Sequence, residues 1–159
     1  MSAVSAQAEK PSPRIPSPII RAIWMLHRRV YAITRGRFGL RPPTSTKWGM
    51  LRLRTIGRRT GKERFAILGY IDDGPNLVIP AMNGWLEPEP AWWFNLQANP
   101  HTTVELHDGR REVVAHAADP EERQRLWDRL VALGTAAYTN ANAATRPRET
   151  AIVVLEPRG

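Results

Sequence analysis

Six short apolar segments, bounded by turns rich in glycine, proline and aspartate, limit the folds available to this chain of 159 residues. Several of them alternate apolar and polar residues, as in LRLR at residues 51–54, which is the period of a strand with one buried face. Tight connections such as the Asp-Gly pair at residues 108–109 favour antiparallel pairing. We therefore expect a mainly β fold of the α+β class, in which six antiparallel strands close into a small barrel flanked by two or three helices. The expected strands are residues 48–55, 64–71, 77–82, 101–108, 111–118 and 150–157.

Two segments in the second half of the chain carry helix start and stop signals. Pro90 suits the first position of a helix expected over residues 91–99, which ends before Pro100. Asp119 suits the N-cap of another helix, expected to extend to about Leu133.

Residues 19–35 predict an N-terminal helix with two unlike faces. At about 100° per residue, its apolar side chains share one broad face, whereas Arg21, Arg28 and Arg35 recur on the opposite side. This pattern is typical of a helix that docks on the rest of its domain; the alternative is a basic helix that lies on anionic lipid. The preceding residues, rich in Ser, Pro and Ala, predict disorder. We expect three parts: a disordered tail at 1–18, a basic helix and linker at 19–41, and a barrel domain at 42–159.

Positive charge is concentrated in the first part of the chain. The net charge is +8; residues 1–41 contribute +7 from eight basic residues and one acid, and residues 42–64 contribute +6 from seven and one. Residues 65–159 contribute −5, from eight basic residues and thirteen acids. Local positive charge suggests an anionic partner, such as nucleic acid, a membrane surface or a phosphorylated ligand, or else only aids solubility. The acidic body and the lack of interleaved aromatic and basic residues argue against nucleic acid.

Composition excludes several kinds of chemistry. The chain has no cysteine, which excludes disulfides, thiolate catalysis and sulfur-ligated metal. His101, His107 and His116 are too widely spaced for a compact metal motif. No apolar run approaches the roughly 20 residues that span a bilayer, and no secretory signal pattern is present. We expect a cytoplasmic protein without a metal site.

The segment RTIGRRTGKERF, residues 54–65, joins the first two expected strands and contains four arginines, one lysine and two glycines. Glycines at a turn let a ligand approach the backbone N–H groups. Arg58 and Arg59 add forked donors that suit phosphate or carboxylate. Arg64, on the returning strand, could face the same anion from the other side. The segment predicts an anion site, although a solvated surface turn has the same composition.

Four blocks of this sequence resemble the deazaflavin-dependent nitroreductase family, the actinobacterial oxidoreductases that use coenzyme F-420. The resemblance extends over about residues 20–157, and the blocks occur in the family's order and at its spacing. It implies a split β-barrel of the FMN-binding-like kind, and hydride transfer from reduced F-420 to an electron-poor acceptor, typically a quinone. The blocks are RTIGRRTGKER (54–64), PAWWFNLQANP (90–100) with TVEL (103–106) behind it, ADPEERQRLW (118–127) and IVVLEP (152–157).

The resemblance also implies where the cofactor binds. The basic turn holds the coenzyme's phosphate and acidic tail, and the deazaflavin ring lies beside the third strand and the start of the tryptophan-containing helix. An apolar slot with a few polar groups suits such a ring. Trp92 and Trp93 lie about 100° apart on a helix, so we expect one in the core and one at the pocket, with Trp92 favoured at the cofactor. The implied cofactor-binding residues are Arg58, Arg59, Thr60, Arg64, Ile67, Leu68, Pro80, Ala81, Met82, Asn83, Ala91, Trp92 and Asn95.

Tyr138 matches the position of an active-site tyrosine in the family, in the loop before the last strand, and either it or water would protonate the reduced acceptor. Packing over the barrel mouth is its alternative role. Met82-Asn83 stands where members active on nitroimidazoles tend to have Ser-Lys, and the loop lacks their further tyrosines. We therefore expect nitro compounds to be doubtful substrates.

Two further readings remain open from the sequence. On the same barrel, the chain would bind deazaflavin, FMN or a hydrophobic ligand without turnover. A membrane role is compatible with the enzyme, because quinones dissolve in lipid and the basic helix at residues 19–35 would hold the protein peripherally at the inner face of the cell membrane.

Overall fold

The computed structural model describes residues 39–82, 89–133 and 150–159, and six residues of the N-terminal segment. The chain divides into two units, residues 1–38 and residues 39–159. In the first unit the described residues are helical and exposed, which agrees with the expected helix as far as they reach; most of that helix and the tail at 1–18 lie outside the described residues. The six residues are Pro18, Arg21, Ala22, Met25, Leu26 and Arg29.

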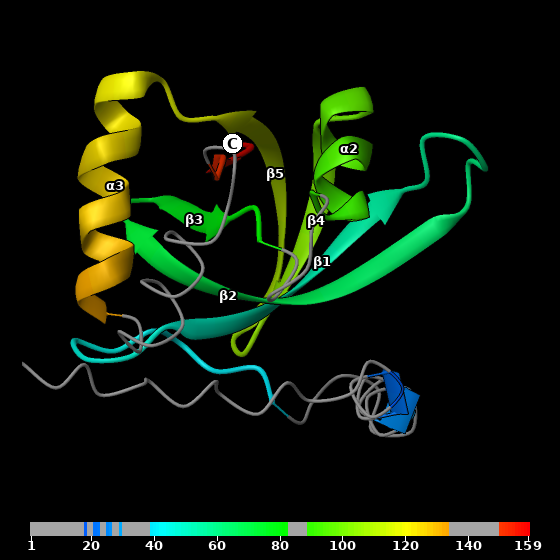
Figure 1. Cartoon of the computed structure of the whole chain (residues 1–159), viewed down its shortest axis with the longest axis horizontal. Coiled ribbons are helices and arrows are strands. Elements are labelled where there is room, and N and C mark those ends of the chain that lie inside the picture. The colour runs from blue at the N-terminus through cyan, green and yellow to red at the C-terminus, as the bar shows by residue number, and fades with distance from the viewer. Residues whose placement is uncertain are drawn as a thin grey trace, which may run out of the picture. The chain divides into compact units, whose positions relative to one another are not determined.

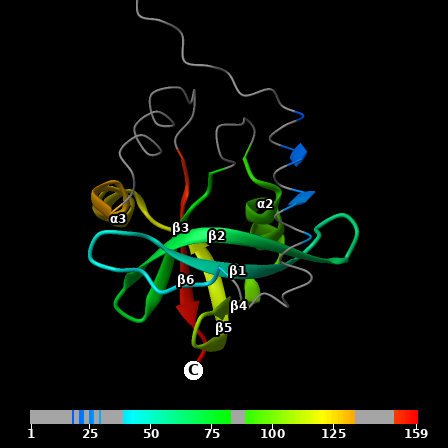
Figure 2. The same ribbon diagram turned by 90° about the horizontal axis from the view of Figure 1, so that it is seen from below.

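The second unit contains a closed barrel of six strands in the order β1-β2-β3-β6-β5-β4, with every neighbouring pair antiparallel (Figures 1 and 2). The expected six-stranded antiparallel barrel is confirmed, and each strand end falls within two residues of its predicted position. The strands are β1 (Gly49–Ile56), β2 (Glu63–Asp73), β3 (Asn76–Pro80), β4 (His101–Leu106), β5 (Gly109–Ala117) and β6 (Ile152–Pro157).

Among the described residues of this unit, two helices flank the barrel, α2 (Ala91–Ala98) and α3 (Pro120–Leu133), and they lie well apart from each other in both views (Figures 1 and 2). Helix α2 packs on the barrel interior, where its two tryptophans join a cluster that includes Leu51 and Leu53. Helix α3 covers the outer face of the sheet through Leu126 and a second cluster. Pro90 is the N-cap of α2 rather than its first helical residue.

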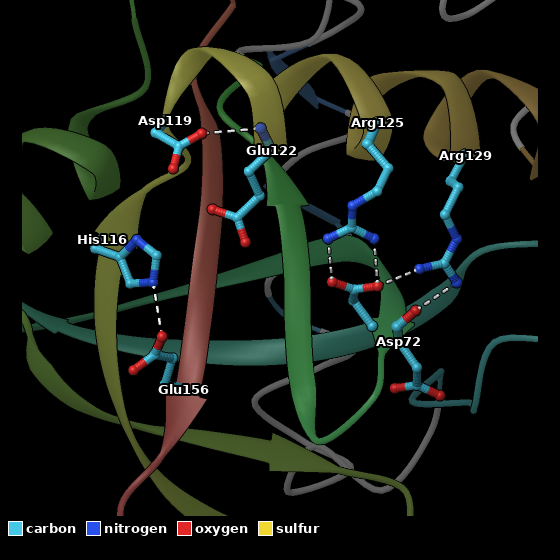
Figure 3. A network of polar contacts seen from close by, with 8 residues as sticks. Asp72, His116, Asp119, Glu122, Arg125, Arg129 and Glu156 are labelled. Carbon is cyan, nitrogen blue, oxygen red and sulfur yellow. Dashed lines mark hydrogen bonds and ion pairs between the residues drawn. The ribbon is translucent and has the colours of Figure 1, made fainter.

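Polar contacts cap the first turn of α3 and attach the helix to the β2–β3 hairpin (Figure 3). The Asp119 carboxylate accepts a hydrogen bond from the Glu122 N–H at 2.9 Å, which confirms the predicted cap. Arg125 makes two hydrogen bonds to the Asp73 carboxylate, at 2.9 and 2.8 Å, and Arg129 donates to Asp73 at 2.5 Å. The hydrogen bonds from Arg125 lower the pKa of Asp73, despite the opposing effect of partial burial. The middle of α3 and the β2–β3 hairpin are thereby joined.

The barrel wall opens where β2 leaves β3. β2 pairs with β1 from Glu63 to Tyr70, but with β3 only from Ile71 to Asp73. β3 continues along β6 as far as Pro80, which has no N–H to donate and ends the strand two residues before the expected residue 82. Among the described residues, the second edge of β2 over residues 63–70 therefore has no strand partner.

Candidate functional site

The basic turn at residues 57–62 joins β1 to β2, and the tip of this hairpin extends past α2 in both views (Figures 1 and 2). The Gly57 N–H donates to the Lys62 carbonyl at 2.8 Å, and the Gly61 N–H donates to the Gly57 carbonyl at 2.8 Å. Gly61 has a φ of +67°, a conformation that favours glycine. A Cβ on Gly57 would lie 2.6 Å from the Thr60 Oγ1. The two glycines thus allow the turn to close tightly on itself.

Arg58 and Arg64 lie on the same side of the hairpin, the side that faces α2. The Arg58 guanidinium carbon is 4.8 Å from the centre of the Phe94 ring. Arg64 is paired with Thr55, and residues opposite each other in a ladder share a face. The Thr55 hydroxyl accepts a hydrogen bond from the side chain of Asn95 in α2 at 3.1 Å. The sequence prediction that the two arginines could face one anion is compatible with this arrangement.

The arginines of the β1–β2 hairpin differ in their partners. Arg54 donates to Glu63 at 2.7 Å, and Arg52 forms an ion pair with Glu105 at 3.0 Å. Within the described part of the chain, by contrast, Arg58, Arg59 and Arg64 form no ion pair. These guanidinium groups bring positive charge that no described carboxylate neutralises.

Backbone donors at the turn add to this charge. Among the described residues, neither the Arg59 N–H nor the Thr60 N–H has an acceptor, and both residues are exposed. Backbone N–H groups beside guanidinium groups suit a phosphate or carboxylate group. The residues present therefore fit the anionic part of a cofactor such as F-420.

Apolar side chains surround the opening between β2 and β3. Ala81 and Trp92 belong to the interior cluster, and the inward-facing Ala66 and Leu68 pack against it but are only partly buried. The Ala81 N–H donates to the carbonyl of Ala151 at 2.8 Å, which continues the wall beyond the end of β3. An apolar surface at this point suits one face of a planar ring.

The other predicted site residues divide into three groups. Leu68 and Met82 are at the opening; Pro80 ends β3, and the exposed Ala91 begins α2. Ile67 is paired with Arg52, on the outer face, so its side chain points away from that of Leu68. Asn83 and Tyr138 lie outside the described residues.

Trp92 and Trp93 are both buried, at 8% and 6% exposure, and both belong to the interior cluster. The expected division between a core tryptophan and a pocket tryptophan is not visible in this arrangement, and Trp92 at the cofactor stays a prediction. Asn95 is also buried, and its side chain amide contacts Arg58 and Thr55.

Phe94 and Thr55 were missed by sequence reasoning. Phe94 contacts Arg58 of the turn, and Thr55 contacts Asn95. Both contacts exist only because α2 packs against the β1–β2 hairpin, which is about 40 residues away in the sequence. The one available signal was Asn95, an amide in an otherwise apolar stretch of helix, since a buried amide requires partners.

A groove of about 200 Å³ lies on the outer face of the barrel, away from Arg64 and Leu68. Its arginines are neutralised: Glu105 pairs with both Arg52, at 3.0 Å, and Arg110, at 2.9 Å. We therefore place the candidate site at the turn and the opening. The groove is lined by Arg52, Arg54, Glu63, Phe65, Thr103, Glu105 and Arg110.

The titratable groups with shifted pKa values lie away from the turn. Burial, reinforced by the charge of Asp72, raises the pKa of Tyr70 to about 12, and Tyr70 pairs with Gly49 at the end of β1 far from the turn. Burial lowers the pKa of His116, but hydrogen bonds to the Ala117 carbonyl and the Glu156 carboxylate raise it above its usual value (Figure 3). Among the described residues, no cluster of His, Asp and Glu suits a metal ion, and no helix is long and apolar enough to cross a membrane.

The family of F420H(2)-dependent quinone reductases matches residues 24–157 of this chain. The F420H(2)-dependent quinone reductase Rv1261c of Mycobacterium tuberculosis strain H37Rv is 33% identical over 135 residues, which cover 84% of this chain and 89% of that protein. The F420H(2)-dependent quinone reductase MT1299 of strain CDC 1551 matches to the same extent.

Solved structures share the fold. An F420-H2 dependent reductase designated FDR-A superposes with a TM-score of 0.61 at 24% identity, covering 67% of this chain and 93% of its own. A protein described as a domain-swapped dimer superposes with a TM-score of 0.64 at 23% identity, and the match covers 88% of this chain and 100% of that protein. The match to the family, which spans most of the chain, confirms the resemblance found in the sequence. The chain therefore belongs to the F420H(2)-dependent quinone reductase family, and it is an oxidoreductase with coenzyme F-420 as its cofactor.

Proposed function

We propose that this chain reduces a quinone with coenzyme F-420 bound between the basic turn and the opening of the barrel wall. The observation that carries the location is the contrast between neutralised and unneutralised arginines. Arg52 and Arg54 pair with glutamates, whereas Arg58, Arg59 and Arg64 pair with no described carboxylate. Leaving several cations without counter-ions costs free energy through mutual repulsion, and a bound anion would remove that cost.

In this proposal the chain's own residues bind and orient. Arg58, Arg59, Thr60 and Arg64 donate to the phosphate and the acidic tail. An apolar surface that includes Leu68, Ala81, Met82 and Trp92 packs on the ring and excludes water from one face. When bound, reduced F-420 supplies the hydride for the quinone. The protein requires no acid–base triad for this chemistry.

Titration of the protein with F-420 tests the site. Arg58→Ala and Arg64→Ala are each expected to weaken binding by about 1–3 kcal/mol, the range for losing hydrogen bonds to a charged group. Arg110→Ala is the matched control, because this arginine lies on the outer face with its side chain 72% exposed. An unchanged Kd in the Arg58→Ala/Arg64→Ala variant would remove the anion site from the turn.

Turnover separates the enzyme from a carrier that only binds. Adding menadione to the protein with reduced F-420 is expected to oxidise the cofactor, as followed by its absorbance. Binding without oxidation would favour a non-catalytic carrier on the same barrel. Parallel titrations with FMN and NADPH test cofactor choice, and we expect F-420 to bind most tightly.

Tyr138, outside the described residues, is the proposed proton donor to the reduced quinone. Tyr138→Phe is expected to lower kcat and to leave the Kd for F-420 unchanged, because the hydroxyl acts on the acceptor. An unchanged kcat would favour water as the donor. Nitro compounds are expected to be poor acceptors for the wild type.

We further propose that the N-terminal helix binds the anionic inner face of the cell membrane, so that this cytoplasmic enzyme meets quinones in lipid. Met25 and Leu26 are 62% and 64% exposed, and the exposed Arg21 and Arg29 lie one turn to either side of Met25. Exposed apolar side chains next to arginines are typical of interfacial helices. In this proposal the chain has three parts: a disordered tail at residues 1–18, the membrane-binding helix and linker at residues 19–41, and the cofactor-binding barrel domain at residues 42–159.

Sedimentation with phosphatidylglycerol vesicles tests the membrane proposal in the full chain. Arg21→Glu/Arg29→Glu is expected to reduce vesicle binding and to leave the Kd for F-420 unchanged. Vesicles of phosphatidylcholine alone are the control for charge. The membrane proposal would be contradicted if the protein bound both kinds of vesicle equally and the substitutions had no effect on that binding.

A further inference from the structure

Asn95 connects α2 to the backbone of the basic turn. Its Oδ1 accepts the Arg58 N–H at 3.1 Å, and its Nδ2 donates to the Thr55 Oγ1 at 3.1 Å. Asn95 is 7% exposed and Thr55 is 3% exposed. Because Arg58 can only donate through its N–H, the orientation of the amide follows from its partners.

An amide at this place is costly unless both of its ends are bonded. Its neighbours in α2 are Trp92, Trp93 and Leu96, which belong to the interior cluster. An apolar side chain could pack in that cluster without any hydrogen bond. A buried amide, in contrast, needs a donor for its oxygen and an acceptor for its nitrogen. The effect of the amide is to determine where the turn sits relative to the helix.

Phe94 holds the same arginine by its side chain. The guanidinium carbon of Arg58 lies 4.8 Å from the centre of the Phe94 ring. Since phenylalanine carries no charge, this cation–π contact restrains the guanidinium without neutralising it. Arg54, in contrast, is held by the Glu63 carboxylate, which also neutralises its positive charge. Two consecutive residues of α2 thus hold the backbone and the side chain of Arg58, and leave its positive charge available.

We infer that Asn95 and Phe94 are positioning residues, which act on the cofactor through Arg58 and not by contacting it. This inference rests on the proposed function, because it assumes that the turn binds the anionic part of F-420. It changes the role predicted for Asn95, from a direct ligand of the cofactor to a support for the turn. Pre-organised donors bind an anion more tightly because less conformational freedom is lost.

The first readout requires no cofactor. In Asn95→Leu, hydrogen exchange of the Arg58 amide, measured by NMR, is expected to accelerate by about tenfold or more as its acceptor is lost. The buried amide of Val104 in the barrel wall should be unaffected. If exchange at Arg58 is unchanged, Asn95 does not hold the turn and the inference is overturned.

The second readout is the Kd for oxidised F-420. Asn95→Leu is expected to weaken binding about fivefold, the equivalent of one ordinary hydrogen bond, in the wild-type background. In the Arg58→Ala background it should have less than about a twofold effect, because residues that act through one group are not additive. Additive losses in the double variant would indicate direct contact of Asn95 with the cofactor and overturn the inference.

Phe94 provides a variant that leaves the buried cluster intact. Phe94→Leu removes the ring face and is expected to weaken binding by about threefold, whereas Phe94→Tyr keeps the face and should retain affinity. Equal losses in both variants would overturn the role of the ring.

Failure of the inference and failure of the proposed function give different results. If Arg58→Ala lowers affinity but Asn95→Leu and Phe94→Leu do not, the cofactor site stands and the positioning role is wrong. If Arg58→Ala and Arg64→Ala leave affinity unchanged, the turn does not bind the cofactor, and both proposals are overturned together.

Discussion

Gly57 shows how closely one residue controls the basic turn. Its N–H donates to Lys62, its carbonyl accepts from Gly61, and a Cβ at this position would lie 2.6 Å from the Thr60 Oγ1 and 3.3 Å from the Lys62 carbonyl. The Lys62 N–H in turn donates to the Thr60 hydroxyl at 3.3 Å. A side chain at residue 57 would therefore disturb the turn that presents Arg58.

We predict that Gly57→Ala lowers stability by about 1 kcal/mol, because the Thr60 hydroxyl must move and the neighbouring backbone must shift slightly. It should also weaken F-420 binding, since the turn that carries Arg58 is displaced. Thermal unfolding and a cofactor titration measure the two effects. Gly159→Ala, where a Cβ meets nothing within 4 Å, is the control. Unaltered stability and affinity would show that the turn accommodates a methyl group.

At the scale of elements, α3 and the β2–β3 hairpin depend on the Asp73 carboxylate. Arg125 and Arg129 both donate to it, and Arg129 also donates to the Asp72 carbonyl at 2.8 Å (Figure 3). Beneath these contacts, Leu126 and Leu130 pack on the sheet. The attachment of α3 therefore combines buried apolar contacts with exposed ion pairs, and pairs exposed to solvent each contribute little to stability.

Asp73→Asn is expected to destabilise the fold by about 1 kcal/mol, a small value because its arginine partners are largely exposed. Since the folded pKa of Asp73 is lowered, its contribution is present above the unfolded pKa of about 3.9. It is lost as the pH falls through the folded value. Urea unfolding at several pH values should show the difference from wild type disappear in acid. Asp128→Asn, which removes a contact with Gln124 within α3, is the control; an equal loss there would refute a special role for Asp73.

His116 links β5 to β6 through Glu156, with the ring nitrogen 3.0 Å from the carboxylate. Its raised pKa means that the contribution to stability is present below the unfolded pKa of about 6.5. The contribution is lost as the pH rises through the higher folded value. His116→Gln should therefore be less stable than wild type in mild acid and equal to it in mild base. The difference in mild acid should be small, because the His116 ring is partly exposed. A difference in stability that does not change with pH would contradict this.

For the whole molecule, the separation of charge affects binding. Residues 42–64 carry +6 and the following residues carry −5, so the field at the turn differs from that of the barrel body. A cofactor with phosphate and carboxylate groups would be attracted to the turn and repelled by the rest. Screening by salt reduces such an interaction at exposed charges.

The Kd for F-420 is accordingly expected to rise as sodium chloride increases from about 0.05 to 0.5 M, since the screening length falls from roughly 14 to 4 Å. Arg58→Ala/Arg64→Ala should flatten this dependence. Titrations across the salt series measure both slopes, with Arg110→Ala as the control. A Kd that does not change with salt would show that charge contributes little to binding.

The strands, their turns and the start of α3 followed from the sequence because they depend on local rules. Alternation, Gly and Pro positions and the Asp119 cap are each contained within a few residues. Alternation also means that adjacent strand residues such as Ile67 and Leu68 face opposite sides, so only one of the two side chains can line the opening.

The sequence by itself determined the order of strands along the chain and the presence of a basic turn, because strand period and turn chemistry act over short distances. Three features required the folded chain: the opening between β2 and β3, the burial of both tryptophans, and the hold of Asn95 and Phe94 on Arg58. Each depends on strand register or on packing between segments distant in sequence. Such contacts are chosen by the free energy of the whole fold, and no short stretch of residues contains that information.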